Sequence, residues 1–291
     1  MNKINSNFLY RLIVPKSIRT LIWKNYLKKM ILSHYGNSKD QEIKDLINNI
    51  KENGLKIISS KLKGDYNQEQ INVNYDAENK MKFVDFDINK RIYFKKNWSK
   101  KRIQKAFNQL LIEQDENSPH RYLTEKFNVD DKTIVADIGC AEANFSLDII
   151  DKVKHIYLFE TNNVWEQPLK FTFEKYKDKV TIVNKKFSNV DSESSVNGSK
   201  FLKDKGVNFI KIDVDGYENE VMSNINEMIK KSNDMKIALC TYHDQDDYNK
   251  YAKALRSFGF EVTSSKGYMI FYWDKNLKFL FLRRGLIRAK K

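Results

Sequence analysis

Short apolar runs alternate with amphipathic stretches over the second half of the chain. The runs are bounded by polar or glycine residues, which predicts buried strands at 133–137, 155–160, 180–184, 209–213 and 236–241. Helical spacing of apolar residues predicts helices between them, at 144–151, 168–175 and 219–230. Two later apolar segments, 260–263 and 268–273, flank a Ser/Gly turn and predict a hairpin. This order predicts an α/β fold: a Rossmann-like doubly wound sheet with an antiparallel edge hairpin.

The first 92 residues have a different pattern and predict a mainly helical, basic N-terminal extension. Apolar and basic residues mix over 8–32 without a narrow stripe, which favours a helix packed on the domain over one lying on a membrane surface. Another helix is expected within 40–62, a polar connector at 63–82 and short strands within 82–94. We therefore expect two domains, 1–92 and 93–291.

The stretch 133–147, TIVADIGCAEANFSL, predicts a strand, a tight turn and a helix. In open α/β sheets, ligands bind outside the carboxyl ends of strands, beside a helix N-terminus. Asp137 ends the strand, and Gly139 provides the backbone freedom that such a turn requires. Glu160 ends the next strand, 23 residues after Asp137. A carboxylate at this distance suits a ribose, because it accepts hydrogen bonds from both hydroxyls.

The turn itself discriminates between two nucleotide cofactors. A nicotinamide dinucleotide requires G-x-G-x-x-G, but residues 139–144 contain one glycine, and Glu142 is unsuited to a diphosphate. S-adenosyl-L-methionine carries no phosphate and has a positive sulfonium, so its site tolerates an acid. The turn therefore predicts S-adenosyl-L-methionine as the cofactor and a methyltransferase rather than a dehydrogenase.

Acids also follow the fourth predicted strand, in FIKIDVDGYENE at 209–220. Asp213, Asp215 and Glu218 suit a neighbouring sulfonium, and equally suit a helix cap. They are also possible ligands of a divalent metal, but no spacing to a histidine or a further carboxylate requires one, so we predict no metal.

One histidine is a candidate general base. His243 follows the fifth strand and is expected at the same edge as Asp213. Methyl transfer to a hydroxyl needs removal of a proton, and histidine is the usual base near neutral pH. The alternative is an imidazole with an ordinary structural role.

The net charge of +14 resides at the two ends of the chain. Residues 1–39 contain 8 Lys/Arg and residues 275–291 contain 7, and neither segment contains an acid. Basic ends favour lipid headgroups, nucleic acid or an anionic substrate as partner; the alternative is a Lys- and Asn-rich composition that drifts to positive charge. Nucleic acid is not our prediction, because the chain lacks an Asn/Asp-Pro-Pro-Tyr type of base pocket.

Composition also bears on the compartment. The two cysteines provide no disulfide framework, and no apolar run approaches the roughly 18 residues of a membrane span. The segment FLYRLIVP is interrupted by Arg11 and Pro15, which makes it a poor signal peptide. We expect a cytoplasmic protein, in peripheral contact with anionic lipid at the inner face of the membrane.

Taken together, the motifs resemble the FkbM family of S-adenosylmethionine-dependent methyltransferases. The resemblance covers roughly 93–291, and each motif is specific only in combination with the others. The matching segments are DIGCAEANFSL (137–147), IYLFETNNVWEQPLKFTF (156–173), DKVTIVNK (178–185), FIKIDVDGYE (209–218), CTYHDQDD (240–247) and SKGYMIF (265–271), with LLIEQDENSPHRYL (110–123) and RRGLIRAK (283–290) outside the core.

The resemblance implies a Rossmann-like fold and O-methylation of a sugar, glycan or small-molecule hydroxyl, often in surface-glycan synthesis. The implied cofactor-binding residues are Asp137, Gly139, Cys140, Glu142, Asn144, Glu160, Thr161 and Asp213. Asp213 resembles the acid at the methyl end, and together with His243, the base candidate from its place after the fifth strand, it forms the predicted catalytic pair. The implied acceptor-side residues are Glu113, Gln114, His120, Arg121 and Asp215.

The chain departs from the family at two positions. Ala143 stands where relatives usually have Gly and is expected to crowd the methionine end of the cofactor, and Asp215 stands where Glu is usual. Together with the basic ends, Ala143 motivates the alternative of a non-catalytic binding protein that keeps the fold and associates with membrane or nucleic acid.

Overall fold

The computed structural model describes residues 14–274 and 277–291, and a seven-stranded sheet lies at their centre. The strand order is β11-β12-β10-β9-β4-β5-β6. These strands are β4 (Ile134–Ile138), β5 (His155–Phe159), β6 (Val180–Val183), β9 (Phe209–Ile212), β10 (Lys236–Cys240), β11 (Glu261–Ser264) and β12 (Leu286–Lys290). The run from β10 to β6 is parallel, and β12 is antiparallel to both of its neighbours. The predicted Rossmann-like doubly wound fold is confirmed.

Helices cover both faces of this sheet because successive strand residues point to opposite sides. Val135 and Phe209 belong to one buried cluster, and Ala136 and Ile210 belong to the other. The first cluster includes residues of α4 (Lys100–Glu113), α5 (Asn144–Ile149) and α6 (Glu166–Thr172). The second includes residues of α7 (Gly198–Leu202), α8 (Glu218–Lys231) and α9 (Asp247–Ser257). Burial on both faces explains why the parallel strands are nearly continuous apolar runs.

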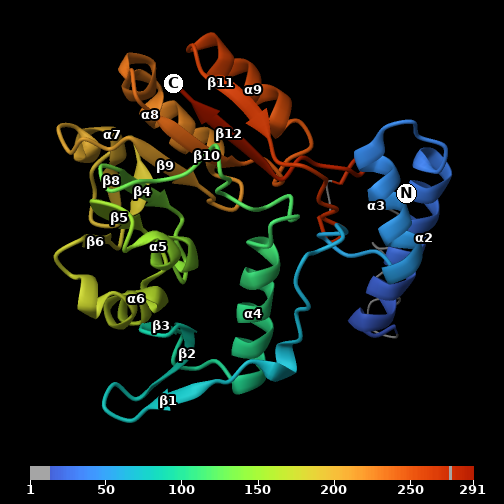
Figure 1. Cartoon of the computed structure of the whole chain (residues 1–291), viewed down its shortest axis with the longest axis horizontal. Coiled ribbons are helices and arrows are strands. Elements are labelled where there is room, and N and C mark those ends of the chain that lie inside the picture. The colour runs from blue at the N-terminus through green and yellow to red at the C-terminus, as the bar shows by residue number, and fades with distance from the viewer. Residues whose placement is uncertain (1–13, 275–276) are drawn as a thin grey trace.

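The predicted edge hairpin has the wrong second arm. The first arm, β11, pairs antiparallel with β12, not with 268–273. Met269 instead makes isolated bridges to Ile58 and Arg283. β12 lies in the segment RRGLIRAK, whose charged residues hide a strand in which four consecutive residues, from Leu286 to Ala289, are buried. Its antiparallel place between β10 and β11 is what closes this side of the sheet (Figure 1).

The N-terminal part forms two separate units. Figure 1 shows α2 (Lys16–Tyr35) and α3 (Gln41–Asn53) side by side and away from the sheet. They share a core with Ile270, Phe281 and Leu282. A small antiparallel sheet of β1 (Asn74–Asp76), β2 (Met81–Asp87) and β3 (Lys90–Tyr93) instead lies against the main domain, with β3 next to α6. β1 falls within the predicted connector, which is therefore wrong at those residues, and the boundary at residue 92 stays a prediction.

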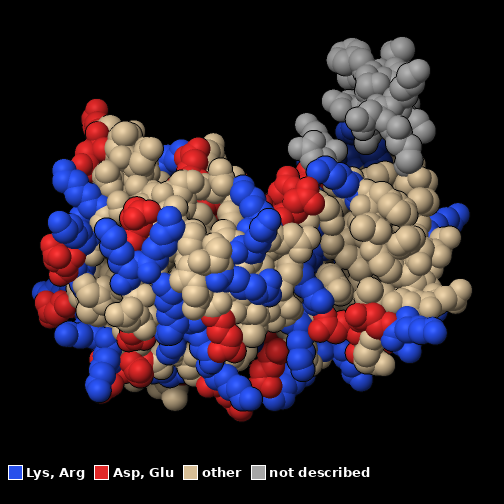
Figure 2. All heavy atoms as spheres, turned by 90° about the horizontal axis from the view of Figure 1, so that it is seen from above, with Lys and Arg blue, Asp and Glu red and all other residues tan. Residues whose placement is uncertain are grey.

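Helix α2 is only partly buried. Leu27 and Ile31 are inaccessible to solvent, whereas Ile18, Leu21 and Ile22 are about half exposed. Residues 8–13 of the predicted helix lie outside the described residues. Figure 2 shows an uncharged surface on the side of α2 and α3, and mixed basic and acidic residues over the rest of that face. Over the described residues, we find no helix with the length and apolar character needed to cross a bilayer.

The remaining elements are short. They are the 3-10 helices η1 (Gln68–Gln70), η2 (Asn163–Trp165) and η3 (Glu174–Tyr176), and the parallel strand pair β7 (Lys186–Ser188) and β8 (Ser195–Asn197). The β7–β8 pair is a separate sheet, and β7 lies in contact with α8.

Candidate functional site

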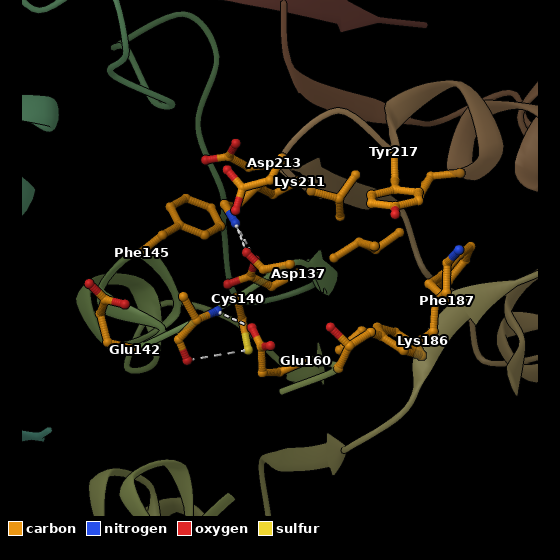
Figure 3. Close-up of a pocket in the computed structure, with 18 of the residues that line it drawn as sticks. Asp137, Cys140, Glu142, Phe145, Glu160, Lys186, Phe187, Lys211, Asp213 and Tyr217 are labelled. Carbon is orange, nitrogen blue, oxygen red and sulfur yellow. Dashed lines mark hydrogen bonds and ion pairs between the residues drawn. The ribbon is translucent and has the colours of Figure 1, made fainter. Parts of the chain in front are cut away.

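A cavity of about 630 Å³ opens at the carboxyl ends of β4, β5 and β9. The chain proceeds from β4 to β5 on one side and places β9 on the other, so this is the switch point at which α/β sheets bind ligands. Among the residues lining it are ten of the predicted site residues: Glu113, Asp137, Gly139, Cys140, Glu142, Asn144, Glu160, Thr161, Asp213 and Asp215. Figure 3 shows Asp137, Glu160 and Asp213 around one space, with Glu142 beside Phe145 at its edge.

The turn after β4 depends on Gly139. Its φ is +78°, and a Cβ added there would lie 2.0 Å from the backbone oxygen of Asp213. Both Gly139 and Cys140 donate their N–H groups to Phe159 O, at 3.0 and 3.1 Å. The turn is therefore tied to the end of β5 on one side and pressed against the end of β9 on the other.

Ala143 does not crowd the cavity. It caps α5 in the left-handed conformation, with φ +57°, and its side chain belongs to the buried core cluster. It is not among the residues lining the cavity, although its neighbours Glu142 and Asn144 are. The expected obstruction at the methionine end is therefore not found, and the position instead carries backbone strain that glycine would avoid.

Glu160 is oriented by the turn. Its Oε2 accepts from Ala141 N at 2.9 Å, and its Oε1 accepts from Asn162 N at 2.7 Å. Two backbone donors fix the carboxylate at the tip of β5, where each oxygen keeps a lone pair. Both oxygens can therefore still accept hydrogen bonds, and the predicted contact with a ribose stays a prediction.

The Asp137 side chain is fully buried, and both of its oxygens accept hydrogen bonds. Lys211 Nζ donates to Asp137 Oδ1 at 2.7 Å and to Gly139 O at 2.9 Å, and Ser146 Oγ donates to Asp137 Oδ2 at 2.7 Å. Burial opposes the charge of Lys211, but the carboxylates of Asp137 and Asp213 raise the pKa of this lysine above its usual value. The buried ion pair therefore joins β4, β9 and the turn.

Sequence reasoning missed Lys211. It lies in FIKIDVDGYE, where a lysine inside a fully buried strand is the available signal. Period-2 alternation places it on the face of Phe209, and the register places it opposite Asp137.

Asp213 is the centre of a second network. Tyr122 Oη donates to Asp213 Oδ2 and Tyr242 Oη donates to Asp213 Oδ1, each at 2.9 Å. His120 Nε2 lies 3.5 Å from Oδ2. Burial would raise the pKa of the Asp213 carboxyl, but the hydrogen bond and positive charge of His120 hold it well below its usual range. Asp213 is therefore a permanent anion that organises both flanking tyrosines.

His243 is surrounded by carboxylates. Its Nδ1 lies 2.9 Å from Glu218 Oε1, and its Nε2 lies 3.4 Å from Asp215 Oδ1 and 3.9 Å from Asp213 Oδ1. Burial lowers the pKa of His243, but the contacts with Asp215, Glu218 and Asp213 outweigh it and raise the pKa to about 10. An imidazolium has no lone pair for a proton, so this environment opposes the predicted role as a base near neutral pH.

In two glutamates, by contrast, burial favours the neutral form of the side chain. Burial raises the pKa of Glu142 to about 7 and also raises the pKa of Glu113. Both line the cavity, and Gln109 Nε2 donates to Glu113 Oε1 at 2.9 Å. A carboxyl group in a cleft whose pKa lies near neutral, as that of Glu142 does, is a candidate for proton transfer.

The predicted acceptor-side residues do not all converge. Glu113 and Asp215 line the cavity, and His120 reaches it through Asp213. Gln114 and Arg121 instead line a smaller cavity of about 280 Å³ next to it. Arg121 Nε donates to Leu123 O and its Nη1 donates to Gln114 O, so this pair stabilises the loop after α4.

Comparison with known proteins finds similarity in structure only. No protein-family model and no curated protein matches the sequence. Methyltransferase FkbM from Methylobacillus flagellatus KT is 15% identical, with a TM-score of 0.43, and the match covers 56% of this chain and 44% of that one. The chain thus spans less than half the length of that protein.

Two further structures are similar to this chain. TrmK of M. capricolum, in complex with S-adenosyl-homocysteine, is 16% identical, with a TM-score of 0.37 over 58% of this chain and 69% of that one. Trm5b from Pyrococcus abyssi is 11% identical, with a TM-score of 0.43 over 76% of this chain and 62% of that one. At these identities and TM-scores the similarities carry no conclusion about activity, cofactor or substrate.

Proposed function

We propose that this chain is an S-adenosylmethionine-dependent O-methyltransferase of the FkbM type. The observation that carries the proposal is the arrangement of Glu160 and Asp213 on opposite sides of the Gly139 turn in one cavity. A diol-binding acid on one side and a permanent anion on the other match the ribose and the sulfonium of one molecule. The volume, about 630 Å³, is within the usual range for ligand sites.

The donor set supports the fit of this cofactor. Glu160 would hold the ribose hydroxyls, and the turn from Gly139 to Asn144 would hold the methionine moiety. Asp213 favours positive charge at the sulfur, because it stays ionised. The side of the cavity beyond Glu160 is lined by Lys185, Lys186 and Tyr217. These side chains would contact the adenine ring of the cofactor.

When bound, S-adenosylmethionine supplies an activated methyl group on a positive sulfur. A bound acceptor oxygen would take this methyl group, and S-adenosylhomocysteine would be the product left behind. The hydroxyl proton must pass to a base of this chain. We assign that role to Glu142, because His243 is held as an imidazolium and Asp213 as a poorly basic anion.

A pH profile tests the assignment. Because the carboxylate form is the base, turnover is expected to rise as pH increases through about 7. Glu142→Gln is expected to reduce turnover by at least about tenfold and to remove this rise. The matched control is Glu116→Gln, an exposed glutamate paired with Lys63. An unchanged pH profile in Glu142→Gln would exclude Glu142 as the base.

Cofactor binding tests the function itself. Calorimetric titration of S-adenosylhomocysteine is expected to show one site in the natural protein. Glu160→Ala should weaken that binding by about ten- to a hundredfold, the usual effect of losing hydrogen bonds to a charged group. Glu166→Ala, on the nearby helix α6, should bind normally. Absence of binding to the folded natural protein would refute the proposal.

The proposed acceptor is a sugar or glycan hydroxyl of the surface-polysaccharide type, methylated in the cytoplasm. The acidic, tyrosine-lined end formed by Glu113, Tyr122 and Tyr242 offers hydrogen bonds to hydroxyls and few positive charges for a phosphate backbone. Transfer of a radiolabelled methyl group to RNA but not to glycans would exclude this acceptor class.

One observation favours a membrane-associated role as the second candidate. The exposed apolar residues Ile18, Leu21 and Ile22 of α2 are interspersed with Lys16, Arg19 and Lys24, a composition that suits an anionic lipid surface. Leu21→Glu should reduce binding to anionic vesicles without changing affinity for S-adenosylhomocysteine. Vesicle binding in a protein that binds no cofactor would favour the non-catalytic alternative.

A further inference from the structure

A second cavity, of about 280 Å³, adjoins the larger one. Leu110, Asn144 and Phe145 line both cavities, so the two have part of their walls in common. Figure 3 shows Phe145 at the edge of the larger cavity. Glu113 lines the larger cavity, and its neighbour in sequence, Gln114, lines the smaller one. A ligand at the acceptor end of the larger cavity therefore has the smaller cavity directly beside it.

Helical periodicity explains which side chains reach the second cavity from α4 and α5. Residues four apart lie on the same face of a helix. Leu110 of α4 and Gln114, which directly follows that helix, are such a pair, and both line the cavity. Asn144 and Asp148 of α5 are a second pair, and they line it as well. The second cavity thus lies between the end of α4 and one face of α5.

Aromatic rings form part of the lining. They belong to Tyr66, Phe86 and Phe145. Tyr66 is held in place because its Oη donates to Asp115 Oδ2 at 2.7 Å. Phe86 packs edge to face against Phe107, with 6.2 Å between the ring centroids, and Phe145 is buried. Rings that are fixed in this way present apolar surfaces of defined orientation to a ligand.

Polar groups without a protein partner line the rest of the second cavity. Among the described residues, no hydrogen-bond or ion-pair partner is found for Gln114 Nε2, Arg121 Nη2, the Asn144 side-chain amide or the Asp148 carboxylate. The Arg121 guanidinium is anchored, since Nε donates to Leu123 O at 3.0 Å and Nη1 donates to Gln114 O. Its free Nη2 is therefore held in a defined place. Together these groups offer a ligand both donors and acceptors.

We propose that the second cavity binds a sugar ring, the unit next to the one that carries the methylated hydroxyl. A sugar ring has C–H groups on its faces and hydroxyls around its edge, which match aromatic rings beside mixed donors and acceptors. The volume of about 280 Å³ is just below the usual range for a complete ligand, which suits one unit of a ligand that continues into the larger cavity.

The acceptor class narrows accordingly, from any sugar hydroxyl to a hydroxyl of an oligosaccharide. This narrowing rests on the proposed methyl transfer, although the binding of a sugar ring in the second cavity does not. A monosaccharide would fill only one of the two cavities and would leave the polar groups of the other to water.

The experiment applies the fluorescently labelled full chain, with S-adenosylhomocysteine present, to an array of immobilised mono-, di- and trisaccharides. Calorimetry then measures the Kd of each sugar that binds. We expect binding of at least one di- or trisaccharide, and at least about tenfold weaker binding of its component monosaccharides.

Asp148→Ala tests whether the second cavity is the site. It should raise the Kd of the bound oligosaccharide at least about tenfold, the usual effect of losing hydrogen bonds to a charged group. Asp148 is exposed and does not line the larger cavity, so the affinity for S-adenosylhomocysteine should not change. The matched control is Glu227→Ala, which removes an exposed acid of α8 and should leave both affinities unchanged. Circular dichroism of each variant verifies that it is folded.

Three results would overturn the proposal: no sugar of the array binds, a disaccharide binds no better than its monosaccharides, or folded Asp148→Ala keeps the natural affinity. Titration with S-adenosylhomocysteine separates this proposal from the one on which the acceptor class rests. Binding of the nucleoside together with any of these three results leaves the methyltransferase function and removes the sugar site. Oligosaccharide binding that Asp148→Ala weakens, in a chain that does not bind the nucleoside, supports the sugar site and refutes the function.

Discussion

Gly139→Ala is expected to lower the free energy of unfolding by about 3–4 kcal/mol, the sum of a left-handed alanine and an overpacked contact. The added Cβ would lie 2.0 Å from the backbone oxygen of Asp213, and backbone cannot rotate out of the way as a side chain can. This clash can be relieved only if the turn moves away from β9, and that movement would also displace Asp213 from the cavity. Urea unfolding measures the stability, and calorimetry should show loss of cofactor affinity in whatever folded fraction remains.

The matched control is Gly216→Ala. Gly216 also has a positive φ, of +97°, but a Cβ there would meet nothing within 4 Å. Gly216→Ala should therefore lower the free energy of unfolding only by the backbone strain of a left-handed alanine, about 1–2 kcal/mol. Equal losses in the two variants would show that the close approach between β4 and β9 contributes nothing, and would contradict our account of the turn.

The second large effect is expected from Lys211→Met. This change leaves the buried Asp137 carboxylate without its cation, and breaking a buried pair in this way costs about 3–5 kcal/mol. The loss should appear in urea unfolding at neutral pH.

A double variant provides the control for this pair. Asp137→Asn keeps the hydrogen bond with Ser146 and removes the charge, so Lys211→Met combined with Asp137→Asn should be more stable than Lys211→Met alone. If the loss of free energy of unfolding in the double variant equals the sum of the losses in Lys211→Met and Asp137→Asn, these side chains do not act as a pair.

Local pattern was sufficient to predict the strands that carry the site. Each parallel strand is a short apolar run ending in a polar residue, so Asp137, Glu160 and Asp213 were placed at strand tips from periodicity alone. Because parallel strands end at one edge of a sheet, their convergence required no further information. Helix α9 was not among the predicted helices, although Tyr248, Tyr251, Ala252 and Leu255 have helical spacing.

Contacts between segments far apart in the sequence could not be predicted from local hydrophobic pattern. Tyr122 and His120 lie in a polar segment without periodicity, and only the folded chain brings them to Asp213. β12 was missed because Arg288 is buried within it. The guanidinium donates to the backbone oxygens of Arg121 and Tyr122, which satisfies its charge in a position where the sequence suggests solvent. The titration of His243 likewise depends on acids from a different strand.

The antiparallel strand β12 has a consequence for the order in which the sheet assembles. β11 precedes β12 in the chain but joins the sheet through β12, so it has no place until β12 has docked on β10. The pairing of β10 with β12 closes a long loop that contains α9 and β11, and such non-local closures are slow. Until it occurs, β10 presents an unpaired apolar edge, the kind of edge on which other chains nucleate aggregation. Docking of β12 therefore completes the sheet and also covers an edge on which other chains could pair.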